Sequence, residues 1–211
     1  MILFFSTAIG LSLPPVFFVS TKRKKMSFAD LLLMELHGME KSKQKNMDII
    51  KALLKELESE FTTTKKFLAL VPMDKFDWAP HEKSMKLKSL ASHIAELPEW
   101  VSLALTTDGL DFETAPYQEK KVENNEDLLK LLEESYEKGK SELAQSNVED
   151  FDKQWILRNG EHILGDLTKY EMMRIAFSQT IHHRAQLGVY LRILNIPIPG
   201  SYGPSADEQG F

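Results

Sequence analysis

The chain has no cysteine among its 211 residues. This absence excludes disulfide bonds, thiolate metal sites and cysteine nucleophiles, and it is compatible with a reducing cytosol. The remaining metal donors are six histidines and 31 acidic residues, together with amide and hydroxyl oxygens. Any metal site must therefore be built from nitrogen and oxygen ligands.

An excess of positive charge is also missing. The 26 basic residues are outnumbered by the acidic ones, which gives a net charge of -5 and a pI near 5.7. No basic stripe interleaved with aromatic residues occurs in the helical segments, whereas nucleic-acid-binding domains usually carry a basic face. We therefore expect no nucleic-acid partner, and a composition of 43% hydrophobic and 27% charged residues indicates a soluble globular domain.

Long apolar runs are absent except at the N-terminus, where Met1 to Ser20 is strongly apolar and Lys22 to Lys25 follows. A secretory signal carries its positive charges before the apolar run, so the order here is reversed. As a membrane anchor the run is barely long enough, and Pro14-Pro15 interrupts it. If it inserts, the basic cluster favours a cytoplasmic main domain. The alternative is that synthesis starts at Met26 or Met47, and in both cases we expect the folded part in the cytoplasm.

Helix-spaced apolar residues predict four main helices. Their expected ranges are Asn46 to Leu70, Ser84 to Leu105, Asn124 or Asn125 to Leu143, and Thr168 to about Leu194. A shorter apolar piece, Phe28 to Met39, predicts a further short helix that ends in a polar break at Lys41 to Lys45. We therefore divide the chain into an N-terminal extension, residues 1–45, and a helical domain, residues 46–211.

Local signals refine these helices. Pro98 predicts a kink in the second one, because it lacks an N–H and its ring crowds the preceding turn. Thr168 to Glu171 matches a capping box at the start of the fourth. Between the third and fourth helices, Trp155 to Arg158 and Glu161 to Leu164 flank Asn159-Gly160, a pair that favours a type I′ hairpin turn. The predicted fold class is an all-α four-helix bundle with a short β-hairpin between helices three and four, followed by a loop tail.

Three residues are candidate metal ligands. Gln179 and His183 are four positions apart on the fourth helix, so their side chains point the same way. His93 lies one position off the apolar stripe of the second helix. Three protein ligands with an open position would let a metal ion bind and activate water. A histidine near a helical core is also commonly hydrogen-bonded to a neighbour without any metal, and the spacing leaves both interpretations open.

Further residues near these three are candidates to orient a ligand or to contact a substrate. They are His182, Arg184, Gln186, Glu96 and Tyr190. His182 is rotated by about 100° around the helix from His183, so it cannot share its direction. Trp100 lies two turns from His93 and could form a wall of the pocket.

Several motifs occur in the order found in one family. Leu90 to Glu96 resembles the helix-two motif of the DinB superfamily, and Ile181 to Arg192 resembles its helix-four motif. Trp78 to Met85, the hairpin around Arg158-Asn159-Gly160 and the tail Ile196 to Glu208 resemble a bacterial subfamily. On these motifs the chain is identified as a member of the DinB/YfiT-like group.

This resemblance implies a metal-binding, often dimeric four-helix bundle with three histidine ligands. His93 and His183 match two of the ligand positions, whereas Gln179 stands at the third. A glutamine carbonyl is a weaker donor for zinc or nickel than an imidazole, so a reduced metal affinity is expected.

Family members with known activity include thiol-S-transferases, maleylpyruvate isomerase relatives and metal-dependent hydrolases. We therefore expect a homodimer that uses Zn, Ni or Mn as a hydrolase or thiol-S-transferase on a small molecule. A low-molecular-weight thiol would have to come from outside, because the chain has none. The alternative is a non-catalytic dimer with a degenerate metal site, binding a small ligand or none. A membrane is a partner only if residues 1–20 are made and inserted.

Overall fold

The computed structural model describes residues 27–118 and 120–208, and the side chains of residues 28–31 and 35–48 lie outside that description. The predicted apolar leader and its basic cluster are likewise outside the described residues. The chain divides into two compact units, residues 1–41 and 42–211, and the site considered below lies in the second. In the described part of the chain, no helix combines the length and apolar character needed to cross a membrane.

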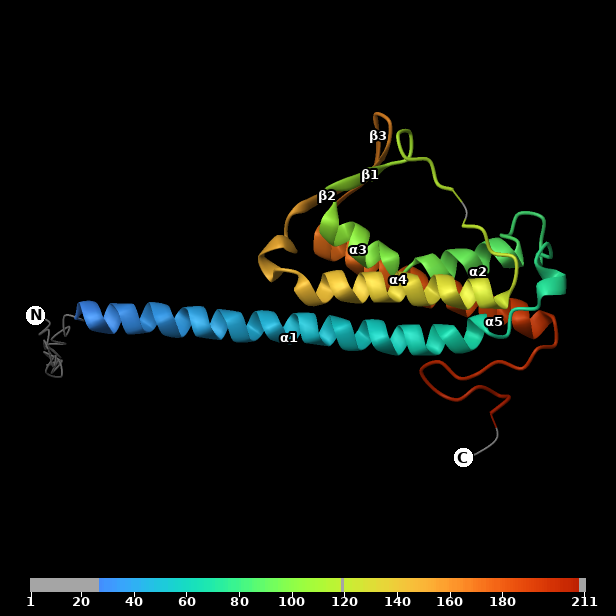
Figure 1. The fold of residues 1–211 in the computed structure, drawn as a ribbon, viewed down its shortest axis with the longest axis horizontal. Helices are drawn as coiled ribbons and strands as arrows, with labels where there is room; N and C mark the ends of the chain where they lie inside the picture. Colours follow the sequence, from blue (N-terminus) through green and yellow to red (C-terminus); the bar gives the residue numbers. More distant parts are fainter. Residues whose placement is uncertain (1–26, 119, 209–211) are drawn as a thin grey trace, which may run out of the picture. The chain divides into compact units, whose positions relative to one another are not determined.

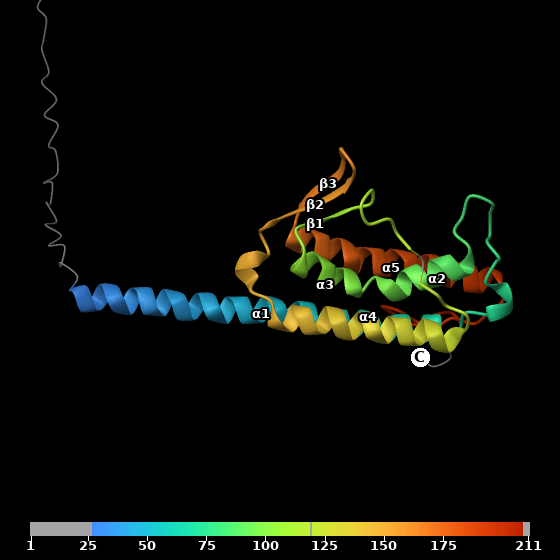
Figure 2. The ribbon, with the colours of Figure 1, turned by 45° about the horizontal axis from the view of Figure 1, so that its top comes forward.

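The architecture is mostly helical with one small sheet (Figure 1). The helices are α1 (Phe28–Leu68), α2 (Leu87–Glu96), α3 (Glu99–Thr106), α4 (Asn125–Gln145) and α5 (Lys169–Ile193), and the strands are β1 (Gly109–Asp111), β2 (Gln154–Asn159) and β3 (His162–Thr168). Single 3-10 turns occupy Met73–Lys75 and Val148–Asp150. Within the second unit, α4, α5 and the α2–α3 pair run side by side with the later part of α1 (Figure 2).

The predicted second helix is divided into two at the expected kink, and Leu97 and Pro98 between them keep helical backbone angles. α2 ends at Glu96 and α3 begins at Glu99. Pro98 has no N–H to continue the ladder. The kink also lies where α4 approaches most closely: a Cβ atom added to Gly139 would be 2.3 Å from the Pro98 carbonyl oxygen. Glycine at position 139 therefore allows the two backbones to meet.

The predicted break at Lys41 to Lys45 is wrong, because α1 is assigned without interruption from Phe28 to Leu68. Lysine and glutamine have high helix propensity, so a polar stretch without proline or glycine does not end a helix.

The ends of α4 and α5 follow their predicted capping signals. The side chain of Asn124 accepts a hydrogen bond from the Asp127 N–H at 2.9 Å and caps α4. Thr168 and Glu171 form both halves of the capping box that begins α5. These local contacts satisfy backbone N–H groups that a helix start leaves without partners.

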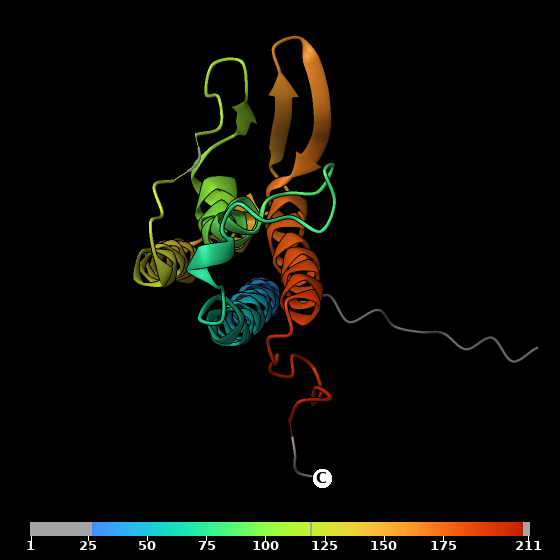
Figure 3. The same ribbon diagram turned by 90° about the vertical axis from the view of Figure 1, so that its right-hand side faces the viewer.

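The sheet contains an antiparallel hairpin, β2–β3, and the strand β1, which pairs in parallel with β2 and was not predicted. Asn159 pairs with His162, so the two-residue loop is Gly160-Glu161. Gly160, the first central residue, has φ = 60°, whereas Glu161, the second, does not have a positive φ, which is the pattern of a type II′ turn. The expected type I′ turn centred on Asn159-Gly160 is therefore wrong. Viewed along the helices, the hairpin projects from the bundle (Figure 3).

Two clusters of buried apolar side chains form the core. One surrounds α2 and includes Leu68, Leu90, Ile94, Leu132 and Leu187. The other surrounds α3 and includes Leu57, Val101, Trp155, Met172 and Phe177. Trp155 is fully buried, and its indole N–H donates to Thr107 Oγ1 at 3.0 Å. This contact fixes the base of the hairpin to the end of α3.

Candidate functional site

His93 and His183 meet between α2 and α5. Their ring centroids are 4.8 Å apart and their planes are inclined by 76°. Two imidazoles bound to one tetrahedral ion would have centroids about 5 Å apart, given metal–nitrogen distances of about 2.0–2.1 Å. The separation of the two rings is therefore compatible with shared coordination of a single ion.

The environment of His93 keeps its imidazole neutral. Burial, followed by the charge of His183, lowers the pKa of His93 from 6.5 to about 4. The edge of the Trp100 ring system lies against it, with centroids 6.0 Å apart and planes inclined by 83°. A neutral imidazole retains a nitrogen lone pair at pH 7, which is the form that binds metal ions.

Gln186 orients His183. The Nδ1–H of His183 donates to Gln186 Oε1 at 2.8 Å, and Gln186 Nε2 donates to His182 Nε2 at 3.1 Å. In this arrangement His183 carries its proton on Nδ1, which leaves its Nε2 with a lone pair. Hydrogen bonds of this kind fix the tautomer and ring orientation of metal-binding histidines. His182 itself is exposed and joins the pair through Gln186.

Gln179 is the remaining candidate ligand. It is half-buried and lies one helical turn before His183 on α5. In residues 27–118 and 120–208, no group of three or more histidine and acidic side chains could hold a metal ion. A third protein donor at this position would therefore have to be another type of residue, and the helix spacing makes Gln179 the candidate.

Arg184 lies in a buried cluster that we call the Arg184 clamp, made of Arg184, Glu60, Thr64 and Tyr202. The guanidinium is 2.6 Å from Glu60 Oε2, donates to Thr64 Oγ1 at 3.0 Å, and donates to the Tyr202 hydroxyl at 3.2 Å. Its side chain is only 2% exposed. Arg184 therefore connects α5 to α1 and to the tail, away from the histidine pair.

Tyr190 makes contacts that hold the fold together. Its hydroxyl donates to the Met85 carbonyl oxygen at 3.3 Å, and its ring meets Trp78 edge-on with centroids 5.6 Å apart. These contacts hold the loop before α2 against α5. The structure does not bring Tyr190 to the histidine pair.

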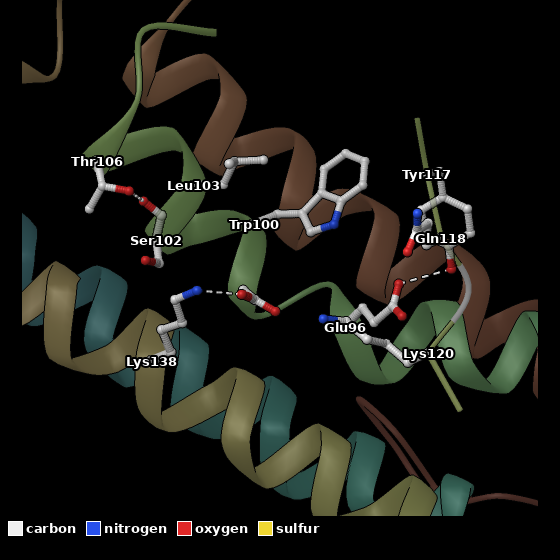
Figure 4. Close-up of a pocket in the computed structure, with 10 residues that line it drawn as sticks. Glu96, Trp100, Ser102, Leu103, Thr106, Tyr117, Gln118, Lys120 and Lys138 are labelled. Carbon is white, nitrogen blue, oxygen red and sulfur yellow. Dashed lines mark hydrogen bonds and ion pairs between the residues drawn. The ribbon is translucent and has the colours of Figure 1, made fainter. Parts of the chain in front are cut away.

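Glu96 borders a cavity of about 220 Å³ beside α3 (Figure 4). Its Oε2 accepts a hydrogen bond from the Tyr117 hydroxyl at 3.0 Å, whereas Oε1 is buried without a hydrogen-bond partner. Burial raises the pKa of Glu96, and this rise is opposed by hydrogen bonds from the Tyr117 hydroxyl and the Lys120 backbone N–H and by the charge of Lys120. Trp100 lines the same cavity and also contacts His93, so the cavity adjoins the histidine pair.

Sequence reasoning named only Glu96 and Trp100 of this cavity, and the residues that it missed include Tyr117, Lys120 and Lys138. Tyr117 and Lys120 belong to a segment without helix or strand, whose sequence has no periodicity to place it. Lys138 lies on the exposed face of α4, where a lysine gives no signal of a ligand site.

Comparisons with known proteins agree on one family. The model of the DinB family matches residues 39–209. A DinB-like protein from Bacillus subtilis is 20% identical with a TM-score of 0.57, covering 71% of this chain and 97% of that chain. A DinB family structure from Exiguobacterium sibiricum 255-15 is 21% identical with a TM-score of 0.55, covering 72% and 95%.

A third solved structure carries a functional description. YfiT from Bacillus subtilis, described as a probable metal-dependent hydrolase with an unusual four-helix bundle topology, is 14% identical with a TM-score of 0.53. The match covers 70% of this chain and 89% of that one. At these identities the structures show a shared fold and nothing about the reaction. No curated protein matches the chain.

Proposed function

We propose that this chain, which belongs to the DinB family, is a divalent-metal-dependent enzyme of the hydrolase type. His93, His183 and Gln179 would hold the ion. The observation that carries the proposal is the approach of the two imidazoles, from α2 and α5, to 4.8 Å between ring centroids. The description of YfiT as a probable metal-dependent hydrolase supports the same reaction class.

The donor set fits a divalent ion held with reduced affinity. His93 is neutral because of its lowered pKa, and Gln186 leaves His183 Nε2 available. Gln179 would add a neutral amide oxygen, which is a weaker donor than a third imidazole for Zn or Ni and less unfavourable for Mn. When bound, such an ion would polarise a water molecule and lower its pKa towards neutrality.

A thiol-S-transferase reaction is a variant of this proposal. The chain contains no cysteine, so the nucleophile would be a low-molecular-weight thiol bound from solution. The residues would keep the same tasks: His93 and His183 would bind the ion, and Gln186 would orient His183. We further propose a small-molecule substrate, a homodimeric assembly and a cytoplasmic location.

Metal content tests the proposal. We expect the purified wild-type chain to take up Zn, Ni or Mn, and His93→Ala to abolish that uptake. Gln179→His should tighten binding by roughly tenfold or more, because it supplies a third imidazole. If the wild-type chain takes up none of the three ions, the proposal is wrong, whatever Gln179→His binds.

Gln179 also favours a second candidate, a non-catalytic protein whose metal site has degenerated. The loss of one strong ligand is a direct way to lose an ion while keeping the fold. This candidate predicts that the wild-type chain binds no metal and that Gln179→His restores binding. Measuring the two proteins side by side therefore distinguishes the candidates, since tight binding by the wild-type chain contradicts the second one.

A further inference from the structure

We propose that the outer face of α5 binds the same face of a second copy of the chain, in an antiparallel helix pair centred on Val189. This inference rests on the homodimeric assembly proposed above and names the surface that would form it. It does not depend on a bound metal ion. We call this surface the α5 stripe, and it consists of Ala185, Val189 and Ile193.

The α5 stripe is an apolar strip on the outside of the bundle. Its three residues follow one another at steps of four along the helix, so their side chains share one face. All three are exposed, Val189 by 58% and Ile193 by 53%. The opposite face of α5 is buried in the two core clusters, for example through Phe177 and Leu187. A helix with apolar side chains on both faces has more apolar surface than its own bundle covers.

α4 provides the comparison, because its outward face is charged. Its exposed residues include Glu126, Lys130, Glu133, Glu134, Glu137 and Lys138. Between Ser178 and Ile193, by contrast, α5 exposes no acidic residue, and the guanidinium of Arg192 is paired with Asp207 at 2.8 Å. In a symmetric dimer each copy presents the same patch to the other. Two α5 stripes can therefore meet without repulsion between like charges.

A groove beside the α5 stripe offers room for the side chains of a facing helix. It lies between α5 and the C-terminal tail and has a volume of about 360 Å³. The α5 stripe forms one wall, and Phe67, Ile198 and Pro199 are among the residues that complete the lining. Because this lining is mostly apolar, it suits aliphatic side chains from a second α5.

The order of large and small side chains fits self-pairing. In an antiparallel pair with its two-fold axis at Val189, positions at equal distances before and after the axis face each other. Each Ile193 would therefore cover the partner's Ala185, and the two Val189 side chains would meet on the axis. A large side chain opposite a small one lets two surfaces interdigitate. A second copy is thus the occupant that the α5 stripe favours.

The size of the contact sets its strength. One helix and one loop from each copy form a small interface, and interfaces below about 1,200 Å² in total are typical of weak complexes. We therefore expect a reversible dimer with a dissociation constant of about 10–100 μM. Sedimentation velocity of the full chain after chelator treatment, from about 1 to 300 μM, measures it. Because no metal is present, failure of dimerisation and failure of metal uptake are separate results.

Three variants locate the surface. Val189→Glu places two carboxylates together at the two-fold axis, and Ile193→Glu places one against the apolar groove. Each should weaken dimerisation at least about tenfold. Ile163→Glu is the matched control, because Ile163 is a similarly exposed residue, 59%, on β3 and outside the α5 stripe. It should leave the dissociation constant unchanged, and circular dichroism checks that all three variants are folded.

The register has a test of its own, since the chain has no cysteine. Val189→Cys places two thiols on the axis, where mild oxidation should join the two copies through a disulfide bond. Ser178→Cys is exposed on the same helix but far from the axis. It should give at least about fivefold less of the linked dimer, because a disulfide needs Cα atoms within about 7 Å.

Four results would overturn the proposal. The first is a chain that stays monomeric up to about 300 μM, which would leave the groove to a small apolar ligand or to another protein. The second is undiminished dimerisation of folded Val189→Glu and Ile193→Glu, which would place the contact on another face. The third is equal weakening by Ile163→Glu, and the fourth is equal linking of Val189→Cys and Ser178→Cys, which would contradict the register.

Discussion

His183 and Arg184 are neighbours in the sequence of α5, yet their surroundings differ in almost every respect. Arg184 is 2% exposed, and acceptors from α1 and the tail surround its guanidinium in the Arg184 clamp. His183 is half-buried, and its hydrogen bond to Gln186 uses only one of its two ring nitrogens. The Arg184 guanidinium is surrounded by acceptors, whereas His183 keeps one ring nitrogen available to bind a metal ion.

The difference follows from a rotation of about 100° per residue along an α-helix. The face that carries Arg184 points into the bundle, where an unpaired charge would be very unfavourable, so the clamp must be complete. The face that carries His183 points towards α2 and His93, where a neutral imidazole can keep a free lone pair. Stability and ligand binding should therefore respond to different substitutions on the same helix turn.

Breaking the clamp should have the largest effect. Arg184→Ala leaves the Glu60 carboxylate buried without its partner, and we expect a loss of about 3–5 kcal/mol in the free energy of unfolding. Urea denaturation measures it. The double variant Glu60→Leu/Arg184→Met, which replaces the pair by apolar side chains, should recover most of the loss. A double variant as unstable as Arg184→Ala would show that the ion pair is not the source of the effect.

Disturbing the histidine face should change metal binding instead. Gln186→Leu removes the acceptor that fixes the His183 tautomer, and the metal affinity should fall roughly 10- to 100-fold. The free energy of unfolding should change little, because the Gln186 contacts are near the surface. Gln186→Glu is the matched control, since it keeps an acceptor for His183 Nδ1. Equal losses of affinity in both variants would contradict the orienting role of Gln186.

Proton binding offers a milder disturbance of the same face. The pKa of His93 is about 4 in the folded chain and 6.5 when unperturbed. Between these values the unfolded chain binds a proton that the folded chain does not, so stability should rise from about pH 4 to 6.5 and then level off. Urea unfolding of metal-free protein at several pH values checks this, with His93→Asn as a variant in which the rise is smaller. An NMR titration that places the His93 midpoint near 6.5 would contradict it.

Features that depend on local signals could be predicted from the sequence. The caps Asn124 and Thr168 could be predicted because each side chain accepts a hydrogen bond from the backbone N–H only three residues later. The period of the helices also placed His93 and His183 on facing sides, and the two rings do lie together. The metal ligation inferred for them stays a prediction.

Features that depend on distant contacts could not be predicted. The clamp joins Arg184 to Glu60, 124 residues earlier, and no pattern in either helix marks the pair. The same holds for the hydroxyl of Tyr117, which reaches Glu96 from an irregular loop. At Pro98 a local rule gave the position of the kink, whereas the close approach of Gly139 on α4 to the same point has no sequence signal.

The smallest expected effect concerns the outer member of the clamp. The Tyr202 hydroxyl donates to Glu60 Oε1 at 2.7 Å and accepts from Arg184 at 3.2 Å, but the residue is 69% exposed. Water can replace much of what Tyr202→Phe removes, and the aromatic ring 5.6 Å from the guanidinium is retained, so we expect a loss of about 1 kcal/mol or less. Urea denaturation beside Ser201→Ala, an exposed neighbour, gives the comparison. If Tyr202→Phe is as costly as Arg184→Ala, the tail is an essential part of the clamp, and Arg184 and Glu60 do not form a self-sufficient ion pair.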